Sequence, residues 1–487
     1  MNHLQDIRRV HLIGICGTAM ASLAGLLKES GFEVRGSDQN VYPPMSTELA
    51  RLGIQLFAGF DAGNLDVRPD LVIIGNALSR GNPEVERVLD EGIRYCSLPE
   101  AVRELFIREH TSIVVTGTHG KTTTTSMLAW IFEFAGLNPN FLIGGIAQNF
   151  HKSYQLGGGS HFIIEGDEYD TAFFDKGPKF LHYLPNAVLL NNVEYDHADI
   201  YPSIDAVKLS FRRLINIIPR NGFLIANVND PVVVELSRAA FCKVIFFGIA
   251  TASTQAGTAS DAEQTGYRAR DIRINSEGTS FSVFEGGKPF SDFRIPLFGD
   301  FNVSNALGAI VTATQFGIGI RIIQKALKTF QSVRRRMEIR GTVGGVTVID
   351  DFAHHPTAIQ QTVKALRSRF PKARLWAVVE PRSATMRRRV SEAELLRAFT
   401  EADEIVVADV YAPEKLPLGQ RLSSERLVEG LKAQGKSARF LRNADAIVET
   451  CCPLARSGDV FVVFSNGGFD NIHEKLLEAM KKRGHHA

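Results

Sequence analysis

The chain has 487 residues, more than one hydrophobic core holds, and a prior of roughly 100–200 residues per domain predicts about three domains. Hydrophobic residues make up 44% of the chain and charged residues 22%, which is typical of a folded globular protein. Because 55 basic residues balance 53 acidic ones, for a net charge of +2, the charge gives no reason to expect nucleic acid or an anionic membrane surface as a partner, and we expect a small substrate.

The five cysteines contain no C-x-x-C pair, so they indicate neither a disulfide framework nor a zinc knuckle, and they suit a reducing cytosol. Arg8-Arg9 before an apolar run imitates a secretory signal, but His11, Gly14 and Gly17 interrupt that run. No stretch reaches the roughly 18 uninterrupted apolar residues of a membrane span. We therefore expect a cytoplasmic protein with no membrane partner.

The first 110 residues alternate apolar runs with helical patterns. Val10 to Ile15 predicts a buried strand, Ala19 to Lys28 a helix, and Glu33 to Ser37 a second strand. A further strand is predicted at Leu71 to Ile74. The alternation predicts a small doubly wound parallel sheet over residues 1–110.

A glycine turn, Gly14-Ile15-Cys16-Gly17-Thr18-Ala19, follows the first predicted strand. Cys16 and Ala19 occupy positions where G-x-G-x-x-G has the glycines that let a dinucleotide pyrophosphate approach, which argues against an NAD-dependent oxidoreductase. A helix N-terminus with free N–H groups still attracts phosphate. The turn therefore either binds a different diphosphate or is a plain strand-to-helix connection.

A second unit opens at Thr111 with a shortened phosphate loop. The stretch T-G-T-H-G-K-T-T follows an apolar run, but Gly117 stands only three residues before Gly120, closer than in the usual G-x-x-x-x-G-K-[ST] loop. The two glycines allow backbone N–H groups to point at phosphate, Lys121 adds a positive charge, and the Thr122 hydroxyl suits magnesium. We expect a nucleotide site here, the alternative being a glycine-rich turn into a helix.

Two further predicted strands deliver polar residues at their carboxyl ends, where open α/β sheets place their ligands. Glu165 follows the strand Phe162 to Ile164, and a carboxylate there suits a magnesium ion that bridges phosphates. His197 lies beyond the strand Val188 to Leu190, and it is either structural or a ligand for a second cation or the transferring phosphate. For Asp170 and Asp175 we expect solvated side chains.

The basic run Arg334-Arg335-Arg336 and Gly341 mark a second boundary, so we divide the chain into residues 1–110, 111–333 and 334–487. The small, polar residues 250–264 predict a surface loop without chemistry. Strands are predicted in the third unit at Val346–Ile349, Leu375–Val379, Glu404–Val407 and Val460–Phe464.

Two strand ends of this third unit carry candidate chemistry. Asp350-Asp351-Phe352-Ala353-His354-His355-Pro356 follows the first strand, and at most one of its adjacent histidines is expected to face a site. Arg382 follows the second strand within Glu380-Pro381-Arg382, where an arginine can grip a carboxylate bidentately.

Taken in order, the short loop, the strand-end acid, the D-H pair, R-R-x-E and D-D-x-x-H-H-P resemble the Mur ligase family of peptidoglycan amide-forming enzymes. The resemblance covers essentially the whole chain. It implies an α/β fold with three domains: an N-terminal Rossmann-like UDP-binding domain, a central P-loop ATPase-like domain and a C-terminal Rossmann-like domain. It also implies ATP and Mg²⁺, and an acyl phosphate as the intermediate of amide formation.

The resemblance implies roles for residues at the matching positions. For ATP binding these are Gly117, Thr118, His119, Gly120, Lys121, Thr122, Thr123, Asn302, Asn305, Arg336 and Asp351. For UDP-sugar binding they are Gly14, Cys16, Gly17, Thr18, Ser37, Asp38 and Asn76. The catalytic residues are Lys121, Glu165, His197 and His354, the metal ligands Thr122, Glu165 and His197, and the acceptor-binding residues Phe352, His354 and Arg382. The family's adenine motif G-x-H-N-x-x-N has Phe301 in place of its histidine here, and Lys208 does not fall at the spacing of the carbamylated lysine that many members use.

The sequence is similar to two branches of the family. The head of the chain is similar to the branch that adds L-alanine to UDP-N-acetylmuramate, although that branch has G-x-G-G-x-G-M at Gly14 to Met20. Several stretches are more similar to the branch that joins the murein tripeptide L-Ala-γ-D-Glu-meso-diaminopimelate to UDP-N-acetylmuramate during peptidoglycan recycling: Gly14–Thr18, Val41–Ser46, Glu168–Asp175, Asp350–Pro356, Glu380–Ser383 and Ser465–Phe469.

The stretch Pro381 to Thr385 keeps one arginine of the alanine branch's P-H-R-Y-S-R and lacks the second, as expected for a longer acceptor. We expect the tripeptide as acceptor and a monomer or weak homo-oligomer, with an alanine ligase and a P-loop regulatory ATPase as the alternatives.

Overall fold

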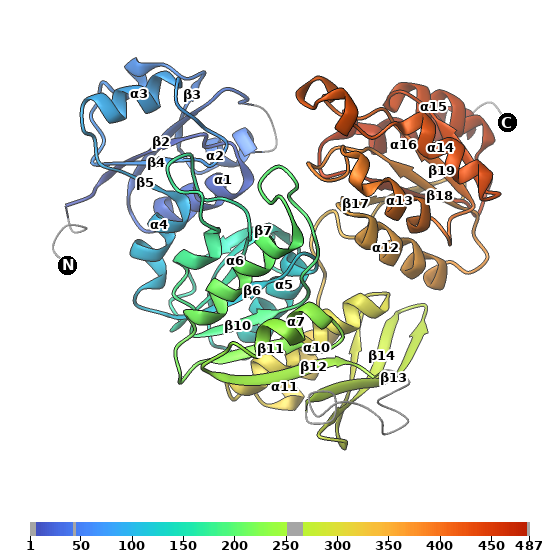
Figure 1. Cartoon of the computed structure of the whole chain (residues 1–487), viewed down its shortest axis with the longest axis horizontal. Coiled ribbons are helices and arrows are strands. Elements are labelled where there is room, and N and C mark those ends of the chain that lie inside the picture. Colours follow the sequence, from blue (N-terminus) through green and yellow to red (C-terminus); the bar gives the residue numbers. More distant parts are fainter. Residues whose placement is uncertain (1–5, 42–44, 251–265, 485–487) are drawn as a thin grey trace.

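The structure, a computed structural model, describes residues 6–41, 45–250 and 266–484. Three sheets follow one another along the chain, and each is flanked by helices. Figure 1 shows the first unit in blue, the central unit from cyan to yellow, and the C-terminal unit in orange and red above the central one. The three-domain α/β prediction is confirmed.

The N-terminal unit is built on a five-stranded sheet with the order β3-β2-β1-β4-β5, and every pairing is parallel. Its strands are β1 (Arg9–Ile13), β2 (Glu33–Asp38), β3 (Gln55–Ala58), β4 (Leu71–Ile74) and β5 (Tyr95–Ser97). Its helices are α1 (Thr18–Glu29), α2 (Met45–Arg51), α3 (Pro83–Asp90) and α4 (Leu98–Val102). The doubly wound prediction is confirmed, and because β1 pairs with both β2 and β4, the turn at Gly14 lies at the switch point of the sheet.

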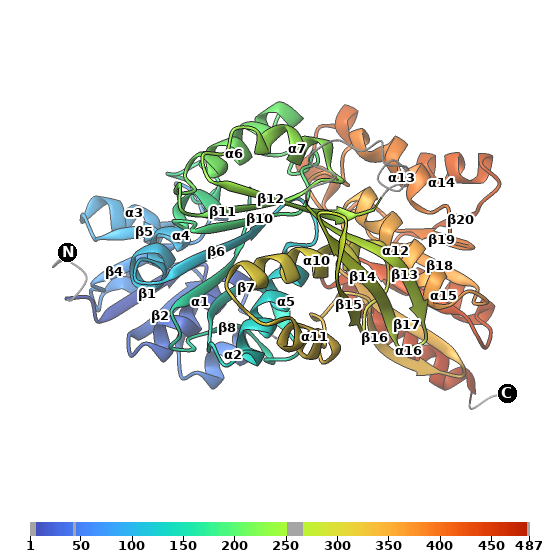
Figure 2. The same ribbon diagram turned by 90° about the horizontal axis from the view of Figure 1, so that it is seen from below.

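The central unit has a ten-stranded sheet with the order β15-β14-β13-β12-β11-β10-β6-β9-β7-β8. Its strands are β6 (Thr111–Thr116), β7 (Asn140–Ala147), β8 (Lys152–Gln155), β9 (His161–Gly166), β10 (Ala187–Leu190), β11 (Phe223–Asn227), β12 (Lys243–Ile249), β13 (Tyr267–Asn275), β14 (Gly278–Glu285) and β15 (Lys288–Ile295). Its helices are α5 (Lys121–Phe134), α6 (Ile204–Asn216), α7 (Pro231–Ser237), α10 (Asp300–Gln315) and α11 (Ile320–Lys328). β6 lies between β9 and β10 and is parallel to both, so the three predicted strand ends meet at one edge. Figure 2 shows β6 and β10 side by side.

Two parts of this unit differ from the prediction or fall outside the described residues. The antiparallel meander β13-β14-β15, which extends one end of the sheet, was not predicted. The predicted loop at 250–264 lies, apart from Ala250, outside the described residues.

The C-terminal unit has a six-stranded sheet with the order β16-β17-β21-β18-β19-β20. Its strands are β16 (Glu338–Val343), β17 (Val346–Asp351), β18 (Leu375–Val379), β19 (Glu404–Val407), β20 (Ser437–Phe440) and β21 (Val460–Phe464). Its helices are α12 (Pro356–Arg369), α13 (Glu392–Ala398), α14 (Ser424–Ala433), α15 (Ala444–Cys451) and α16 (Ile472–Gly484). Gly341 lies inside β16, which pairs antiparallel with β17, so its interpretation as a boundary marker is wrong.

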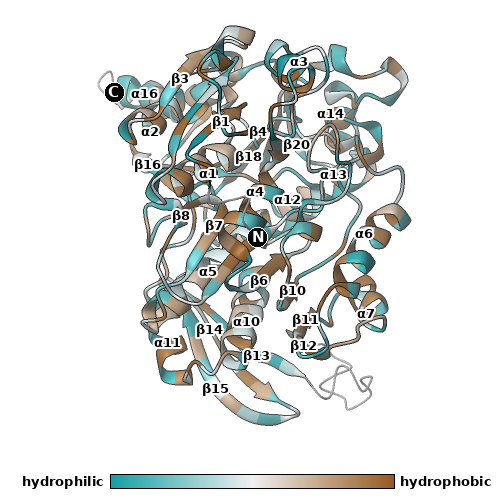
Figure 3. Cartoon of the chain, turned by 90° about the vertical axis from the view of Figure 1, so that its left-hand side faces the viewer, coloured by the Kyte–Doolittle hydropathy of each residue, from teal (hydrophilic) through white to brown (hydrophobic). Residues whose placement is uncertain are grey.

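The units differ in how they are joined. One buried hydrophobic cluster runs from the first sheet into the central one and includes Leu12 and Phe162, whereas the C-terminal sheet has two other clusters, one of which takes in Phe298 of the central unit. In Figure 3 the strands at the centre of the molecule are mostly brown, as expected for strands buried on both faces. In the part of the chain that the structure describes, no helix is both long and apolar enough to cross a membrane.

Candidate active site

The phosphate loop between β6 and α5 is shaped by two glycines with positive φ. Gly117 has φ +131° and Gly120 has φ +80°. A Cβ at Gly117 would lie 2.9 Å from the backbone N and O of Asn192, and one at Gly120 would lie 2.4 Å from Asn305 Oδ1. The loop is therefore wedged between the segment after β10 and the first turns of α10, and both positions require glycine.

Lys121, the first residue of α5, is held inside this loop. Its Nζ donates to Gly117 O at 2.7 Å and to Glu168 Oε2 at 2.8 Å. Burial lowers the lysine pKa, but the charges of Glu168 and Asp167 and the hydrogen bond to Glu168 together outweigh burial and raise it. Burial raises the Glu168 pKa, yet Lys121 and His197 together lower it to about 2, so Lys121 and Glu168 are both charged. Glu168 was missed as a site residue because it stands three residues past the strand-end acid that the pattern selects.

Glu165 and Thr122 form the oxygen-rich part of the site. Thr122 Oγ1 donates to Glu165 Oε1 at 2.8 Å, and Gly144 N donates to Glu165 Oε2 at 2.7 Å. Burial and the Asp167 charge raise the Glu165 pKa. A hydroxyl and a carboxylate side by side are hard oxygen donors, which suit magnesium. The residues present therefore fit the metal that the sequence predicts.

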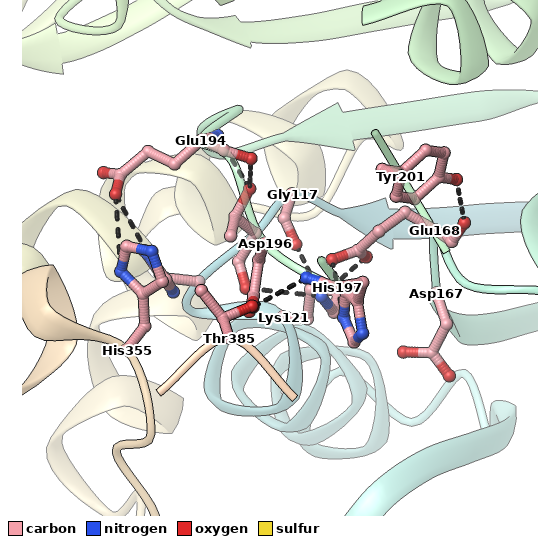
Figure 4. A network of polar contacts seen from close by, with 12 residues as sticks. Gly117, Lys121, Asp167, Glu168, Glu194, Asp196, His197, Tyr201, His355 and Thr385 are labelled. Atoms are coloured by element: carbon pink, nitrogen blue, oxygen red, sulfur yellow. Dashed lines mark hydrogen bonds and ion pairs between the residues drawn. The ribbon is translucent and has the colours of Figure 1, made fainter. Parts of the chain in front are cut away.

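His197 lies at the same edge, in the segment after β10. Its φ is +53°, unusual for a residue other than glycine, and its Nε2 is 3.4 Å from Glu168 Oε1. In Figure 4 dashed lines join the Glu168 carboxylate to both Lys121 and His197. Burial lowers the His197 pKa, but the hydrogen bond and charge of Glu168 leave it raised. Glu168 thus links the predicted lysine to the predicted histidine.

The C-terminal unit reaches this edge through Arg336, whose Nη2 donates to Thr122 Oγ1 at 3.3 Å. Asp351 is buried, burial raises its pKa, and its carboxylate accepts from Met337 N at 2.8 Å and Ala353 N at 2.9 Å. In this structure Asp351 orders the chain around Arg336, and its contact with a nucleotide stays a prediction. Asn305 lies against Gly120, as given above, while Asn302 Nδ2 donates to Phe298 O at 2.8 Å.

The predicted acceptor residues gather at the ends of β17, β18 and β21. The Phe352 ring lies 5.1 Å from the Arg335 guanidinium, which donates to Gly467 O at 2.8 Å. Gly467 in turn packs against Arg382, whose guanidinium lies 3.6 Å from the Tyr411 ring centroid. Arg382 and Phe352 are therefore brought to one loop, Ser465 to Gly467, although they stand 30 residues apart in the chain.

His354 is neutral at physiological pH in this arrangement. Burial lowers its pKa to about 4. Its Nδ1 lies 2.9 Å from the Phe352 carbonyl oxygen, so Nδ1–H donates and Nε2 keeps its lone pair. A neutral imidazole with a free nitrogen can accept a proton, as the prediction of a catalytic role requires.

The predicted sugar-nucleotide turn is held by β2. Gly14 N donates to Ser37 O at 2.8 Å, and Cys16 N donates to Asp38 Oδ2 at 2.9 Å. The Ser37 hydroxyl is fully buried and donates to Glu84 Oε2 at 2.8 Å, so its side chain cannot touch a ligand here, and its predicted contact is corrected to a supporting role. The other predicted residues at this turn and at the end of β4 are exposed or half-buried: Gly14, Cys16, Gly17, Thr18, Asp38 and Asn76.

The segment that carries His197 is also clamped by the C-terminal unit, through residues that the sequence did not single out. Thr385 Oγ1 donates to Asp196 Oδ1, which also accepts from His197 N at 2.7 Å. Thr357 Oγ1 donates to Glu194 Oε2 at 2.7 Å. No spacing or motif pairs residues that stand about 160–190 positions apart.

Comparison with known proteins places this geometry in a family. Family models match residues 9–110 as "Mur ligase family, catalytic domain", residues 115–313 as "Mur ligase middle domain" and residues 335–467 as "Mur ligase, glutamate ligase domain". The chain is 40% identical to the UDP-N-acetylmuramate–L-alanyl-gamma-D-glutamyl-meso-2,6-diaminoheptandioate ligase of Escherichia coli (strain K12), covering 98% of this chain and 99% of the relative.

The chain is also 31% identical to the UDP-N-acetylmuramate–L-alanine ligase of Clostridium acetobutylicum, and the match covers 96% of this chain and 97% of that relative. Among solved structures, a murein peptide ligase from Psychrobacter arcticus 273-4 is 35% identical with a TM-score of 0.71, over 97% of this chain and 98% of that one. With matches to all three parts of the chain and a relative at 40% identity over nearly its whole length, the chain belongs to the Mur ligase family of amide-bond-forming enzymes.

Proposed function

We propose that this protein is an ATP-dependent ligase that joins the tripeptide L-Ala-γ-D-Glu-meso-diaminopimelate to UDP-N-acetylmuramate in peptidoglycan recycling. The observation that carries the proposal is the meeting of Lys121, Thr122, Glu165 and His197 at one sheet edge, which Arg336 of the C-terminal unit reaches. The similarity over almost the full length to a ligase named for this tripeptide supports the choice of acceptor.

The chemistry follows from the poor electrophilicity of a carboxylate. The lactyl carboxylate of UDP-N-acetylmuramate attacks the γ-phosphorus of ATP, the bond to the bridging oxygen breaks, and ADP leaves with the electron pair. Lys121 neutralises charge on the moving phosphoryl group, the kind of electrostatic positioning that dominates such steps. Mg²⁺ held by Thr122, Glu165 and His197 would supply further neutralisation of the phosphate charge.

The tripeptide amine then attacks the carbonyl carbon of the acyl phosphate, and the bond from that carbon to the phosphate oxygen breaks. The products are the amide and inorganic phosphate, and the proton of the amine passes to a base. We assign that role to His354, which is neutral and keeps Nε2 free. Arg382 and Phe352 supply a cation and a ring at the edge where the acceptor is expected.

The acceptor is tested by supplying ATP, Mg²⁺ and UDP-N-acetylmuramate and comparing free L-alanine with the tripeptide, with ADP release and the amide product as readouts. We expect release that depends on the tripeptide. Release that prefers alanine would identify an alanine ligase, and release without any acceptor would identify a regulatory ATPase. Quenching of the protein's fluorescence on addition of NAD would instead favour an NAD-dependent oxidoreductase.

We also propose that the reaction takes place in the cytoplasm and that the protein acts as a monomer or weak homo-oligomer. The five cysteines are all free in the structure, which suits a reducing compartment. Sedimentation at several protein concentrations tests the oligomeric state, and a stable tetramer would contradict it.

A further inference from the structure

Three potential metal ligands meet where the central and C-terminal units touch, and none of them belongs to the predicted magnesium set. His119 comes from the phosphate loop, Glu194 from the segment after β10, and His355 from the residue that caps α12. His119 Nε2 lies 3.4 Å from Glu194 Oε2, and His355 Nδ1 lies 3.6 Å from the same oxygen. The three ligand atoms all lie within 4.8 Å of one another.

The hydrogen bonds around His355 fix the nitrogen that it offers. Its Nε2 is 3.3 Å from the Tyr195 carbonyl oxygen, so Nε2–H donates and Nδ1 carries the lone pair. Nδ1 also accepts from Thr357 N at 3.3 Å as the N-cap of α12, and it faces Glu194, so a metal ion bound to Nδ1 would replace that cap hydrogen bond. A metal-bound histidine typically donates its other ring N–H to a carbonyl or carboxylate in this way.

Glu194 is positioned by a similar outer contact. Thr357 Oγ1 donates to Glu194 Oε2 at 2.7 Å, which holds the carboxylate toward the two imidazoles. Figure 4 shows the Glu194 carboxylate directly opposite the His355 ring. The side chains of His119, Glu194 and His355 are 14%, 34% and 4% exposed, so the group is shielded but not sealed.

We propose that His119, Glu194 and His355 form a site for a divalent transition-metal ion of the zinc type that bridges the central and C-terminal units. Ligand atoms placed about 2.0–2.2 Å from a tetrahedral zinc ion lie roughly 3.3–3.6 Å apart, in the range of the two short separations here. Two imidazoles and one carboxylate favour zinc over magnesium, which prefers oxygen ligands. A cavity of about 200 Å³, lined in part by Glu194, His355 and Thr385, leaves room for a water as the fourth ligand and for entry of the ion.

An ion at this position ties the phosphate loop to the C-terminal unit. Because it binds the folded and closed arrangement, it raises the melting temperature and slows any step that requires the two units to separate. The site is therefore one at which zinc would hold the enzyme closed.

The test is titration of the tag-free, full-length protein with Zn²⁺ by calorimetry, and with Co²⁺ by visible absorption, without ATP or acceptor. His355→Asn removes the imidazole but keeps a good helix cap, and Glu194→Gln keeps an acceptor for Thr357. His119→Gln removes the third ligand. The matched control is His182→Gln, since His182 pairs with the single carboxylate of Asp175 at 2.8 Å.

We expect one Zn²⁺ per chain, a tetrahedral Co²⁺ spectrum, and affinity at least about tenfold weaker in each of the three variants but unchanged in the control. Absence of binding by the natural chain would overturn the proposal. So would binding that survives in His355→Asn and Glu194→Gln, or that is lost instead in Thr122→Ala. Because no ligation is measured, failure here is distinct from failure of the proposed function.

Discussion

The Lys121 ammonium and the Glu168 carboxylate are joined by a hydrogen bond of 2.8 Å in the loop where nucleotide phosphate is expected. Glu168 therefore accepts one of the hydrogen bonds of the Lys121 ammonium, and a nucleotide phosphate would share or replace that bond. The same carboxylate lies 3.4 Å from His197 Nε2, so Glu168 contacts both the predicted lysine and the predicted histidine.

Removal of the Lys121 charge should abolish most turnover. We expect Lys121→Ala to lower the ligation rate by about 10²–10³-fold or more, because the transferring phosphoryl group loses its cation. The matched control is Lys208→Ala, since Lys208 also pairs with a glutamate, Glu235, at 2.7 Å but lies at the surface. Steady-state ADP release measures both, and near-normal ligation by Lys121→Ala would contradict the assignment of the loop.

Loss of Lys121 also leaves the buried Glu168 without its cation, which destabilises the fold. The double variant Lys121→Met/Glu168→Gln removes that stray charge. It should recover stability in urea unfolding without recovering turnover, and recovery of both would mean that Lys121 serves the fold alone.

Gly120→Ala should disrupt nucleotide binding through a collision with Asn305. The new Cβ would lie 2.4 Å from Asn305 Oδ1, and φ at this position is +80°. Gly136→Ala is a matched control, because Gly136 has φ +73° but nothing within 4 Å of the added Cβ. Both variants carry backbone strain of order 1 kcal/mol, so equal loss of ATP affinity in the two would refute the collision.

Thr385→Val should weaken the clamp on the segment that carries His197. The variant leaves the buried Asp196 without the Thr385 hydroxyl, a loss of about 1–2 kcal/mol or roughly tenfold in the population of the closed arrangement. We expect kcat to fall by about this factor while ATP affinity changes little, since the loop contacts remain. Thr400→Val, at an exposed position two residues past the end of α13, is the control and should behave like the natural chain.

His354 should make stability depend on pH. Its pKa is lowered by burial from 6.5 to about 4, so as pH falls through this window the unfolded chain binds a proton that the folded chain refuses. The contribution of a neutral His354 to the free energy of unfolding is fully present above pH 6.5 and is lost as the pH falls toward 4. Between about pH 7.5 and about pH 5.5 the loss is of order 1 kcal/mol.

The measurement is urea unfolding at those two pH values. His354→Gln should lose about 1 kcal/mol less than the natural chain between them, whereas the exposed His151→Gln should match it. Equal pH dependence in all three proteins would contradict a buried, neutral His354.

The sequence predicted the strands of the central site correctly but missed one edge strand and the surroundings of one predicted binding residue. Apolar runs that end in Gly117, Glu165 and the segment of His197 predict strands, and parallel strands put their carboxyl ends on one edge, so β6, β9 and β10 could be expected to meet. Antiparallel β16 was missed because a six-residue edge strand with Gly341 inside it looks like a connection. The Ser37 side chain was misassigned because a polar residue at a strand end gives no sign of whether it faces solvent or Glu84.

The sequence by itself determined the order of three α/β units, the shortened phosphate loop and most of the polar residues at the strand ends, because these depend on local periodicity and on spacing along the chain. Only the tertiary structure decided that Glu168 neutralises Lys121, that Thr385 clamps Asp196, and that His119, Glu194 and His355 converge. Such contacts join residues that lie far apart in the chain and share no local pattern, and their energies depend on distance and burial, which exist only once the chain has folded.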